Sequence, residues 1–470
     1  MSNPELGNFD GMRARSIWTS SRPVMRILAG VARWAVARAP NTLSSGAVAR
    51  EDEGSSGTLS VHANAVALFL TLVVSAGLGY VSWLVSARLM SANAVGLAAA
   101  VVSASLLCSN FAILGLGISV ISFLPKERRN PDALLNGFIT IVVIGGGICS
   151  GAFIVLAATS LEQLHFLGSD VPLGLCFVGL ATATTVLLLL DGASIAVRRA
   201  DFCVVRSFVA GVLKLLSLPI VWAVSTLSAT AIVFAWFIST AAACVVGLRE
   251  MRRIFPTYRY RPRISSRWTK VAIWNGLPNH ALSLARLAPG LIIPIIVTES
   301  LSPAKNAYWY AAWTIAFLAR FIPVATAQAV FAELTNRSAS FTRASWRSLW
   351  SSFLVSLAPV TIVIVFAYPI LLLMGRRYAV EGALPLRLLA LGVLPQALIE
   401  FYIVARRVAM RLTEPNIVLG LSAGASVLAA AYGAQVGGLV GVAIGWLAVE
   451  TATGLWAATR LVRGIRRERT

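Results

Sequence analysis

Apolar residues follow one another in uninterrupted runs along most of the chain, and short polar connections separate the runs. A run of about 20 apolar residues spans the hydrocarbon core of a bilayer as a helix. Because the runs are continuous rather than alternating, they indicate helices and not the strands of a membrane barrel. We therefore predict an all-α polytopic membrane protein with about twelve transmembrane helices. The predicted helices cover residues 64–87, 95–123, 135–159, 172–190, 204–225, 228–248, 271–297, 307–332, 350–374, 384–405, 416–433 and 436–459.

The basic residues test this helix count. Of the 40 Lys and Arg residues, 32 fall in segments that the count places on one side of the membrane, beginning with the N-terminal segment. Cytoplasmic segments of membrane proteins carry such an excess, so we predict that both termini are cytoplasmic. Five basic residues fall on the opposite side, and the last three of them oppose the rule without an explanation from the sequence. The five are Arg88, Lys305, Arg376, Arg377 and Arg387.

A basic segment in the middle of the chain divides the predicted helices into two sets of six. Six plus six helices around a cytoplasmic linker is a common transporter layout, in which the site often lies between the halves. We therefore predict a basic N-terminal tail, disordered or at the membrane interface, then a six-helix lobe, a linker, a second six-helix lobe and a basic C-terminal tail. These parts cover residues 1–57, 58–248, 249–270, 271–460 and 461–470.

Composition and motifs argue against several classes of protein. A net charge of +21 would indicate nucleic acid binding in a soluble protein, but cytoplasmic segments account for it here, so we expect no nucleic acid partner. None of the four Lys follows Gly, so no P-loop is present. The five Cys lack CxxC spacing and the three His stand far apart, so we expect no metal site and no cofactor.

Ionisable and polar residues inside the predicted helices are the candidates for function, because such residues are costly in a membrane and usually face a cavity. The seventh predicted helix carries a polar stripe at steps of three and four residues, which places the stripe on one helical face. Two prolines follow and should kink or break the outer half of this helix. The stripe is Asn275, Asn279, Ser283, Arg286 and Gly290, and the prolines are Pro289 and Pro294.

Three cations at membrane depth predict a cavity that receives an anionic group, because Arg binds phosphate bidentately. The candidate substrate-cavity residues are these cations together with polar neighbours on the same helical faces. They are Lys214, Asn275, Asn279, Ser283, Arg286, Arg320 and Gln328. The candidates for binding a coupling ion are the acidic residues at membrane depth, Glu400, Glu450 and Asp191.

Structural interpretations remain open for the same residues. Either of the two arginines could pair with Glu400 or Glu450 as a salt bridge between helices, since buried charges are usually paired. Lys214 could extend its ammonium toward the membrane interface. The asparagines of the stripe could simply form hydrogen bonds between helices.

Several stretches resemble the bacterial polysaccharide flippases, the Wzx-like O-antigen and repeat-unit translocases of the multidrug/oligosaccharidyl-lipid/polysaccharide exporter superfamily. They include a small-residue GLG turn before a proline and the segment GGLVGVAIGW near the last helix. The resemblance extends over residues 60–465, with the stretches in the same order as in the family. The stretches are Tyr80–Pro125, Leu190–Leu216, Ala307–Glu333, Gly375–Leu398 and Gly437–Trp446.

This resemblance implies a V-shaped, two-lobed exporter fold in the bacterial inner membrane, with Lys214 and Arg286 as cavity cations. It implies a flippase that moves a polyprenyl-pyrophosphate-linked oligosaccharide by alternating access, among membrane lipids and beside a polysaccharide polymerase and glycosyltransferases. Drug-exporting relatives carry acidic residues in their first helices, and here the first two helices have none. A multidrug or metabolite antiporter and an envelope scaffold remain alternatives. A membrane glycosyltransferase, polymerase or ligase usually needs a large soluble loop or an acidic catalytic cluster, and the sequence has neither.

Overall fold

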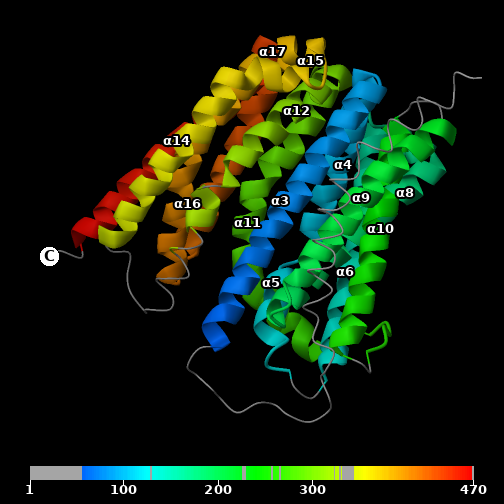
Figure 1. The fold of residues 1–470 in the computed structure, drawn as a ribbon, viewed down its shortest axis with the longest axis vertical. Helices are drawn as coiled ribbons and strands as arrows, with labels where there is room; N and C mark the ends of the chain where they lie inside the picture. Colours follow the sequence, from blue (N-terminus) through cyan, green and yellow to red (C-terminus); the bar gives the residue numbers. More distant parts are fainter. Residues whose placement is uncertain are drawn as a thin grey trace, which may run out of the picture.

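All regular elements in the described part of the chain are helices, as the sequence predicts (Figure 1). The computed structural model describes residues 56–127, 130–224, 229–255, 258–263, 266–321, 323–327, 330 and 343–467. Nearly all of the predicted tail, 1–57, and the candidate Gln328 lie outside these residues. The helices are α3 Ser56–Leu89, α4 Ala92–Ala112, α5 Leu116–Phe123, α6 Pro131–Ser160, α7 Phe166–Ser169, α8 Val171–Ala196, α9 Asp201–Val224, α10 Ala229–Ile254, α11 Ser266–Ser300, α12 Pro303–Ala319, α14 Arg343–Leu372, α15 Arg376–Leu391, α16 Val393–Val408 and α17 Thr413–Arg467.

Eleven candidate membrane spans lie within the described residues, and the last of them is a hairpin of two helices. The α17 backbone leaves helical geometry at Gly438, where φ is 55° and glycine is favoured. The two arms then run antiparallel, because Gly433 packs on Gly441 and the hydroxyl oxygens of Ser422 and Thr453 lie 2.8 Å apart. Counting both arms gives the predicted twelve helices, so the all-α polytopic fold class is confirmed.

The second predicted helix, 95–123, is wrong as a single helix. Leu114 and Gly115 have φ of 48° and 77°, and this left-handed turn separates α4 from α5. Glycine also permits the close approach of α11 here, because a Cβ on Gly115 would lie 2.7 Å from the carbonyl carbon of Gly276. The turn therefore coincides with a contact between the two halves of the chain.

Two other predicted helices are also interrupted. The first part of the eighth predicted helix, 307–332, corresponds to α12, which ends at Ala319. Arg320 therefore lies in the turn after α12 and not in the middle of a helix. The tenth, 384–405, is divided into α15 and α16 at Gly392, which lies against the ring of Trp446. By contrast α11 runs unbroken through its prolines, so the predicted break in its outer half is wrong.

The predicted linker, 249–270, is largely helical at its two ends. Helix α10 continues to Ile254 and α11 begins at Ser266. The segment between them lies on α6, where Asn136 Nδ2 donates to the carbonyl of Arg259 at 2.9 Å and the amide of Arg263 donates to Thr140 Oγ1 at 3.2 Å. These hydrogen bonds fix the course of the connection.

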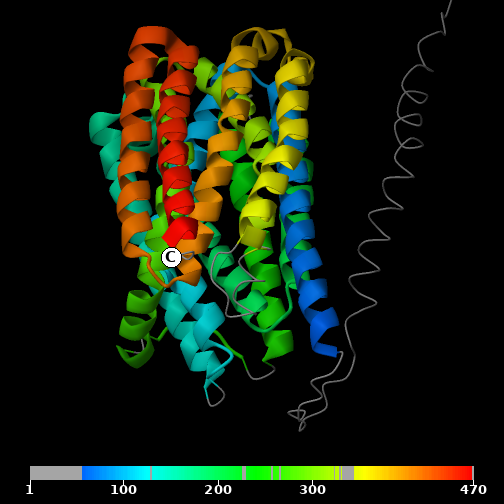
Figure 2. The ribbon, with the colours of Figure 1, turned by 90° about the vertical axis from the view of Figure 1, so that its left-hand side faces the viewer.

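Helices α3 to α10 pack mainly with one another, and helices α11 to α17 do the same (Figures 1 and 2). We call these groups the N-half and the C-half. They meet where α4 and α5 pack on α11 and α12. At one end of this contact Asn306 Nδ2 donates to the carbonyl of Gly96 at 2.8 Å, and at the other Ser119 Oγ donates to the carbonyl of Ala272 at 2.5 Å. The two halves are therefore in contact at both ends of the helix pair α4–α5.

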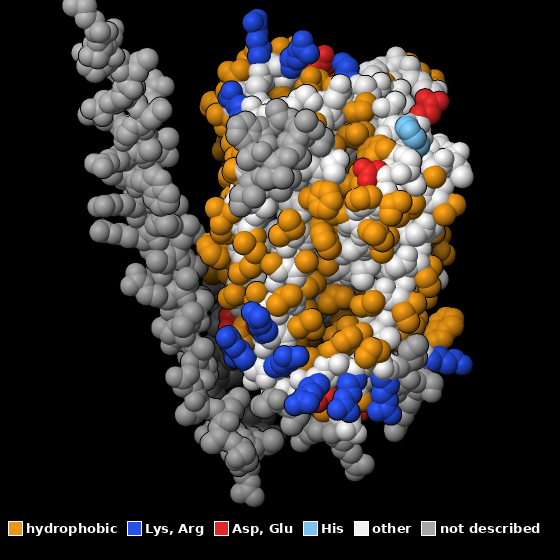
Figure 3. All heavy atoms as spheres, turned by 90° about the vertical axis from the view of Figure 1, so that its right-hand side faces the viewer, with side chains coloured by type: hydrophobic (Ala, Val, Ile, Leu, Met, Phe, Trp, Pro, Cys, Tyr) orange, Lys and Arg blue, Asp and Glu red, His pale blue; other side chains and the backbone are white. Residues whose placement is uncertain are grey.

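The surface suits a multi-pass membrane protein. Figure 3 shows a band of hydrophobic side chains with Lys and Arg gathered above and below it. Side chains such as Ile148, Leu175 and Leu428 are 66–72% exposed, which a lipid environment permits.

Three of the five basic residues predicted at the end opposite the linker bind protein acceptors. Arg88 Nε donates to the carbonyl of Leu373 at 2.6 Å, at the C-terminal end of α14. Lys305 pairs with Glu381 at 2.8 Å, and Arg387 lies within α15 rather than in a loop and donates to a carbonyl of α14. Arg88, Lys305 and Arg387 therefore have acceptors within the protein, although they lie on the side where the charge rule expects few basic residues. Arg376 and Arg377 are exposed.

Candidate functional site

Two arginines of the C-half converge on one carboxylate. Glu400 on α16 forms an ion pair with Arg286 on α11 and a second with Arg320, whose Nη2 lies 3.3 Å from Glu400 Oε1. Only 4% of the Glu400 side chain is exposed, against 18% for Arg286 and 11% for Arg320. The salt bridges that the sequence left open as an alternative are therefore present in the structure.

A second carboxylate adjoins this group. Glu450 on α17 lines a cavity together with Gln396 on α16, Arg320 and Arg286. The five side chains line one cavity of about 30 Å³ with Ser422 of α17. Two guanidinium groups and two carboxylates balance one another in this group, whereas the sequence, with three cations against two carboxylates at membrane depth, predicts a modestly cationic cavity.

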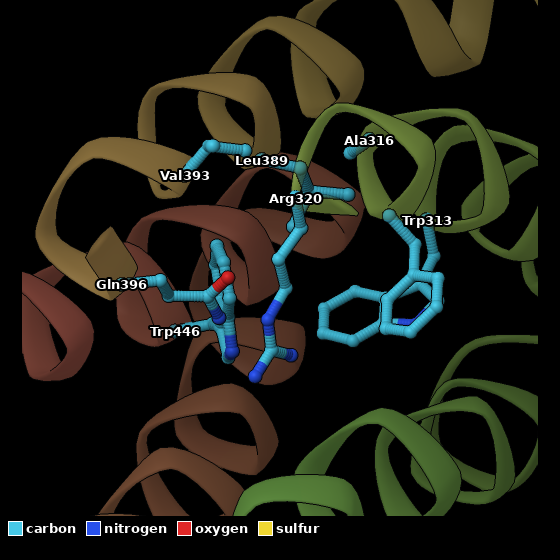
Figure 4. Close-up of a pocket in the computed structure, with 8 residues that line it drawn as sticks. Trp313, Ala316, Arg320, Leu389, Val393, Gln396 and Trp446 are labelled. Carbon is cyan, nitrogen blue, oxygen red and sulfur yellow. The ribbon is translucent and has the colours of Figure 1, made fainter. Parts of the chain in front are cut away.

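Aromatic rings form the other side of Arg320. A further cavity of about 20 Å³ is lined by Arg320, Gln396 and the rings of Trp313, Phe317 and Trp446. Figure 4 shows the guanidinium of Arg320 extended between Trp313 on one side and Trp446 with Gln396 on the other. The two indole rings meet edge to face, with centroids 5.3 Å apart. We call the two adjoining cavities the C-half compartment.

The third predicted cation lies elsewhere. Lys214 on α9 lines a cavity of about 200 Å³ whose residues all belong to N-half helices α3, α4, α8, α9 and α10. Its ammonium lies 3.2 Å from the ring centroid of Trp236. The structure thus brings Arg286 and Arg320 together and places Lys214 in a separate cavity, one in each half rather than a single cavity between them.

The most strongly paired charge was missed from the sequence. Arg206, which the charge count assigned to a cytoplasmic loop, lies inside α9 with 2% of its side chain exposed. It pairs with Asp191 at 2.6 Å and with Glu250 of α10, and it also donates to Ser194 Oγ at 3.0 Å. The eight-residue spacing from Arg206 to Lys214, two helical turns on one face, was the available signal. Asp191, a predicted candidate for binding a coupling ion, is thus already paired with Arg206.

The polar stripe on α11 is only partly buried. Asn275 is exposed and Asn279 is half-buried, while Ser283 Oγ donates to the carbonyl of Asn279 at 3.0 Å within the same helix. At the far end of the stripe, Gly290 allows the ring of Trp313 to approach, because a Cβ there would lie 2.6 Å from that ring. The residues that line the two cavities of the C-half compartment include one member of the stripe, Arg286.

Metal coordination has no support in the described residues, where no three His, Cys, Asp or Glu side chains are grouped as ligands. The five cysteines all lie in this part of the chain, and each is a free thiol.

The fold has known counterparts among solved structures. A multidrug resistance MATE family transporter of the MOP superfamily, in an inward-facing conformation, is 15% identical with a TM-score of 0.63, covering 85% of this chain and 98% of its own. The lipid II flippase MurJ, in an inward closed conformation, is 12% identical with a TM-score of 0.66, covering 85% and 87%. The Vibrio cholerae MATE transporter VcmN, in its bent form, is 15% identical with a TM-score of 0.54, covering 87% and 99%.

Sequence comparisons add no relative. No protein-family model matches the chain, and no curated protein matches its sequence significantly. At 12–15% identity, the structural likeness establishes the fold: the chain has the architecture shared by MATE transporters and MurJ.

Proposed function

We propose that the protein is a flippase, not an enzyme, which moves a polyprenyl-pyrophosphate-linked oligosaccharide across the bacterial inner membrane by alternating access of its two halves. The C-half compartment carries this proposal. Its indole rings offer flat apolar faces on which sugar rings can stack, while Arg320, Gln396 and Glu450 offer donors and acceptors for sugar hydroxyls. Arg286 and Arg320 would meet the pyrophosphate, because guanidinium groups bind phosphate oxygens bidentately.

Alternating access fits the contacts between the halves. The α4–α5 pair touches α11 and α12 at both ends, through Gly96 and Asn306 at one end and Ser119 and Ala272 at the other. An exporter of this kind would release one set of contacts while keeping the other. The cavities of the compartment hold only about 20 and 30 Å³ here, so the cargo would enter after this separation.

The acidic residues favour a second candidate, an antiporter for organic cations or metabolites. Glu400 and Glu450 line the cavity that adjoins the one lined by Trp313 and Trp446, and carboxylates near aromatic rings also suit an aromatic cation. The flippase remains the better candidate because Glu400, which an organic cation would need, is already paired with two guanidinium groups, whereas a pyrophosphate would compete with Glu400 for those same groups. The described helices α3, α4 and α5 also contain no Asp or Glu.

The test is reconstitution of the full chain in liposomes with a fluorescent polyprenyl-pyrophosphate glycan, followed by an assay of the protected leaflet. The flippase predicts faster exchange between leaflets than in empty liposomes. Arg286→Ala is expected to abolish the exchange while the protein stays inserted and abundant. Arg376→Ala, which removes an exposed arginine at the far end of the molecule, is the matched control and should keep it.

Each outcome decides between the candidates. No acceleration by the wild-type protein refutes the flippase, and proton-driven uptake of an organic cation in the same liposomes would establish the antiporter instead. Exchange that survives Arg286→Ala refutes the role of the C-half compartment. Glycosyltransferases and a polysaccharide polymerase are the partners that a flippase of this kind would serve.

A further inference from the structure

The N-half cavity holds a cation without a counter-ion. The ammonium of Lys214 faces a space of about 200 Å³ and rests on the ring of Trp236. Among the residues that the structure describes, no carboxylate lies within ion-pair distance of Lys214 Nζ. Arg206, Arg286 and Arg320 each have a carboxylate partner, which Lys214 lacks.

An uncompensated ammonium in a membrane-spanning helix is costly, because the surroundings solvate charge poorly. The indole face of Trp236 compensates only part of this cost, since a cation–π contact replaces a fraction of lost hydration. Snorkelling, which the sequence left open, does not describe Lys214, because its ammonium lies on a ring inside the helix bundle. A negative charge in the cavity would complete the compensation.

The nearest acidic residue on the cavity wall does not supply that charge. Asp191 lines the same cavity but binds Arg206 through both Nε, at 3.1 Å, and Nη2, at 2.6 Å. Arg206 precedes Lys214 by eight residues, which is about 12 Å along a helix. The ion pair of Asp191 with Arg206 and the unpaired ammonium of Lys214 therefore lie at different ends of the cavity.

The remaining lining suits a small anion. Ser75, Ser207 and Thr240 line the cavity with Lys214, and the hydroxyl group of each is able to donate a hydrogen bond to an anion. The space greatly exceeds the 10–15 Å³ or so that one water needs. Since all the lining comes from the N-half, the ligand need not carry a lipid chain or a glycan.

We propose that this cavity binds one small anion, of halide or inorganic phosphate size, between the ammonium of Lys214 and the hydroxyls of Ser75, Ser207 and Thr240. The proposal goes beyond transport and does not rest on the cargo, because binding can be measured without any lipid-linked substrate. A phosphate group of a lipid-linked substrate has the same chemistry, so the experiment includes it as a separate arm.

The test measures the unfolding temperature of the purified full chain in detergent during titration with bromide or inorganic phosphate, at ionic strength kept constant with gluconate. The wild-type protein is expected to show a saturable rise, since a ligand of the folded state stabilises it. Lys214→Met should lose the rise. Lys305→Met removes an exposed lysine that pairs with Glu381 and should keep it. No rise in the wild type, or an equal rise in Lys214→Met, overturns the proposal.

Fluorescence supplies a second measurement that does not depend on stability. Bromide bound at Lys214 would lie near the indole of Trp236 and quench it, adding a saturable component to the collisional quenching of the other tryptophans. Trp236→Phe keeps an aromatic face under the ammonium and should remove that component; if the component persists, the site lies elsewhere. A rise produced by short-chain polyprenyl pyrophosphate alone, and by neither free anion, would assign the cavity to the cargo and overturn the small-anion site.

Discussion

Removing the charge of Glu400 should destabilise the protein more than removing any exposed carboxylate. Glu400→Gln keeps the shape of the side chain but leaves Arg286 and Arg320 without their shared ion-pair partner. Breaking a buried ion pair by changing one partner costs about 3–5 kcal/mol, because the other charge stays buried. Glu400 is 4% exposed and serves two guanidinium groups, so we expect a value within that range. The unfolded fraction would rise by about two to three and a half orders of magnitude.

The assay is equilibrium unfolding in mixed micelles followed by tryptophan fluorescence. Glu381→Gln is the matched control, because Glu381 also pairs with a cation, Lys305, but both side chains are 40% exposed. An exposed pair contributes about 0–1 kcal/mol. A Glu400→Gln variant as stable as Glu381→Gln would refute the reasoning, and would mean that Glu450 neutralises the arginines by itself.

A double-mutant cycle separates the pair from other effects. Arg286→Gln alone leaves Glu400 paired with Arg320, so it should cost less than Glu400→Gln. Combined with Glu400→Gln it removes one of the two stranded charges. We therefore expect the double variant to be more stable than the sum of the single changes predicts, by about 0.5–3 kcal/mol. Strict additivity would show that Arg286 and Glu400 do not interact in solution.

Three further changes test other parts of the structure, each by the same unfolding assay. Gly433→Leu should destabilise the α17 hairpin by about 1–3 kcal/mol or more, because a Cβ there already lies 2.2 Å from the carbonyl oxygen of Gly441; wild-type stability would argue against the antiparallel hairpin. Arg206→Met should cost about 3–5 kcal/mol because it leaves the buried carboxylate of Glu250 unpaired, and a second change, Glu250→Gln, should recover part of the loss. Asn306→Ala should cost about 0.5–1.5 kcal/mol through its buried bond to the Gly96 carbonyl; no change would show that this contact between the halves contributes nothing.

The number and order of the helices could be predicted because each depends on a local property, the length of an apolar run. The interruptions could not. Hydropathy continues unchanged through Leu114 and Gly392, and the breaks there depend on neighbours distant in sequence, such as Gly276 against α5 and Trp446 against Gly392. Even the α17 hairpin, predicted three residues early, depends on the turn at Gly437 and Gly438, where Gly438 has a positive φ.

The candidate site was predicted in part for a similar reason. Buried charges are usually paired, so the pairing of Arg286 and Arg320 with Glu400 could be named as an alternative. Helical spacing does not say which helices pack together, so nothing separated Lys214 from these arginines. Arg206 was missed because the charge count assigned it to a cytoplasmic connection, although the predicted helix 204–225 contains it; α9 begins at Asp201 and carries it inside.

Contacts between aromatic rings connect the N-half cavity to the boundary between the halves. Lys214 lies on Trp236, whose ring centroid is 5.7 Å from that of Trp83 on α3. Trp83 in turn meets Tyr310 on α12 of the C-half edge to face at 4.9 Å. Separation of the halves at this level would have to break the contact between Trp83 and Tyr310, which removes one of the two ring contacts of Trp83. Because the ring of Trp236 lies against the Lys214 ammonium and against Trp83, we expect a displacement of Trp83 to change how strongly the cavity attracts a negative charge.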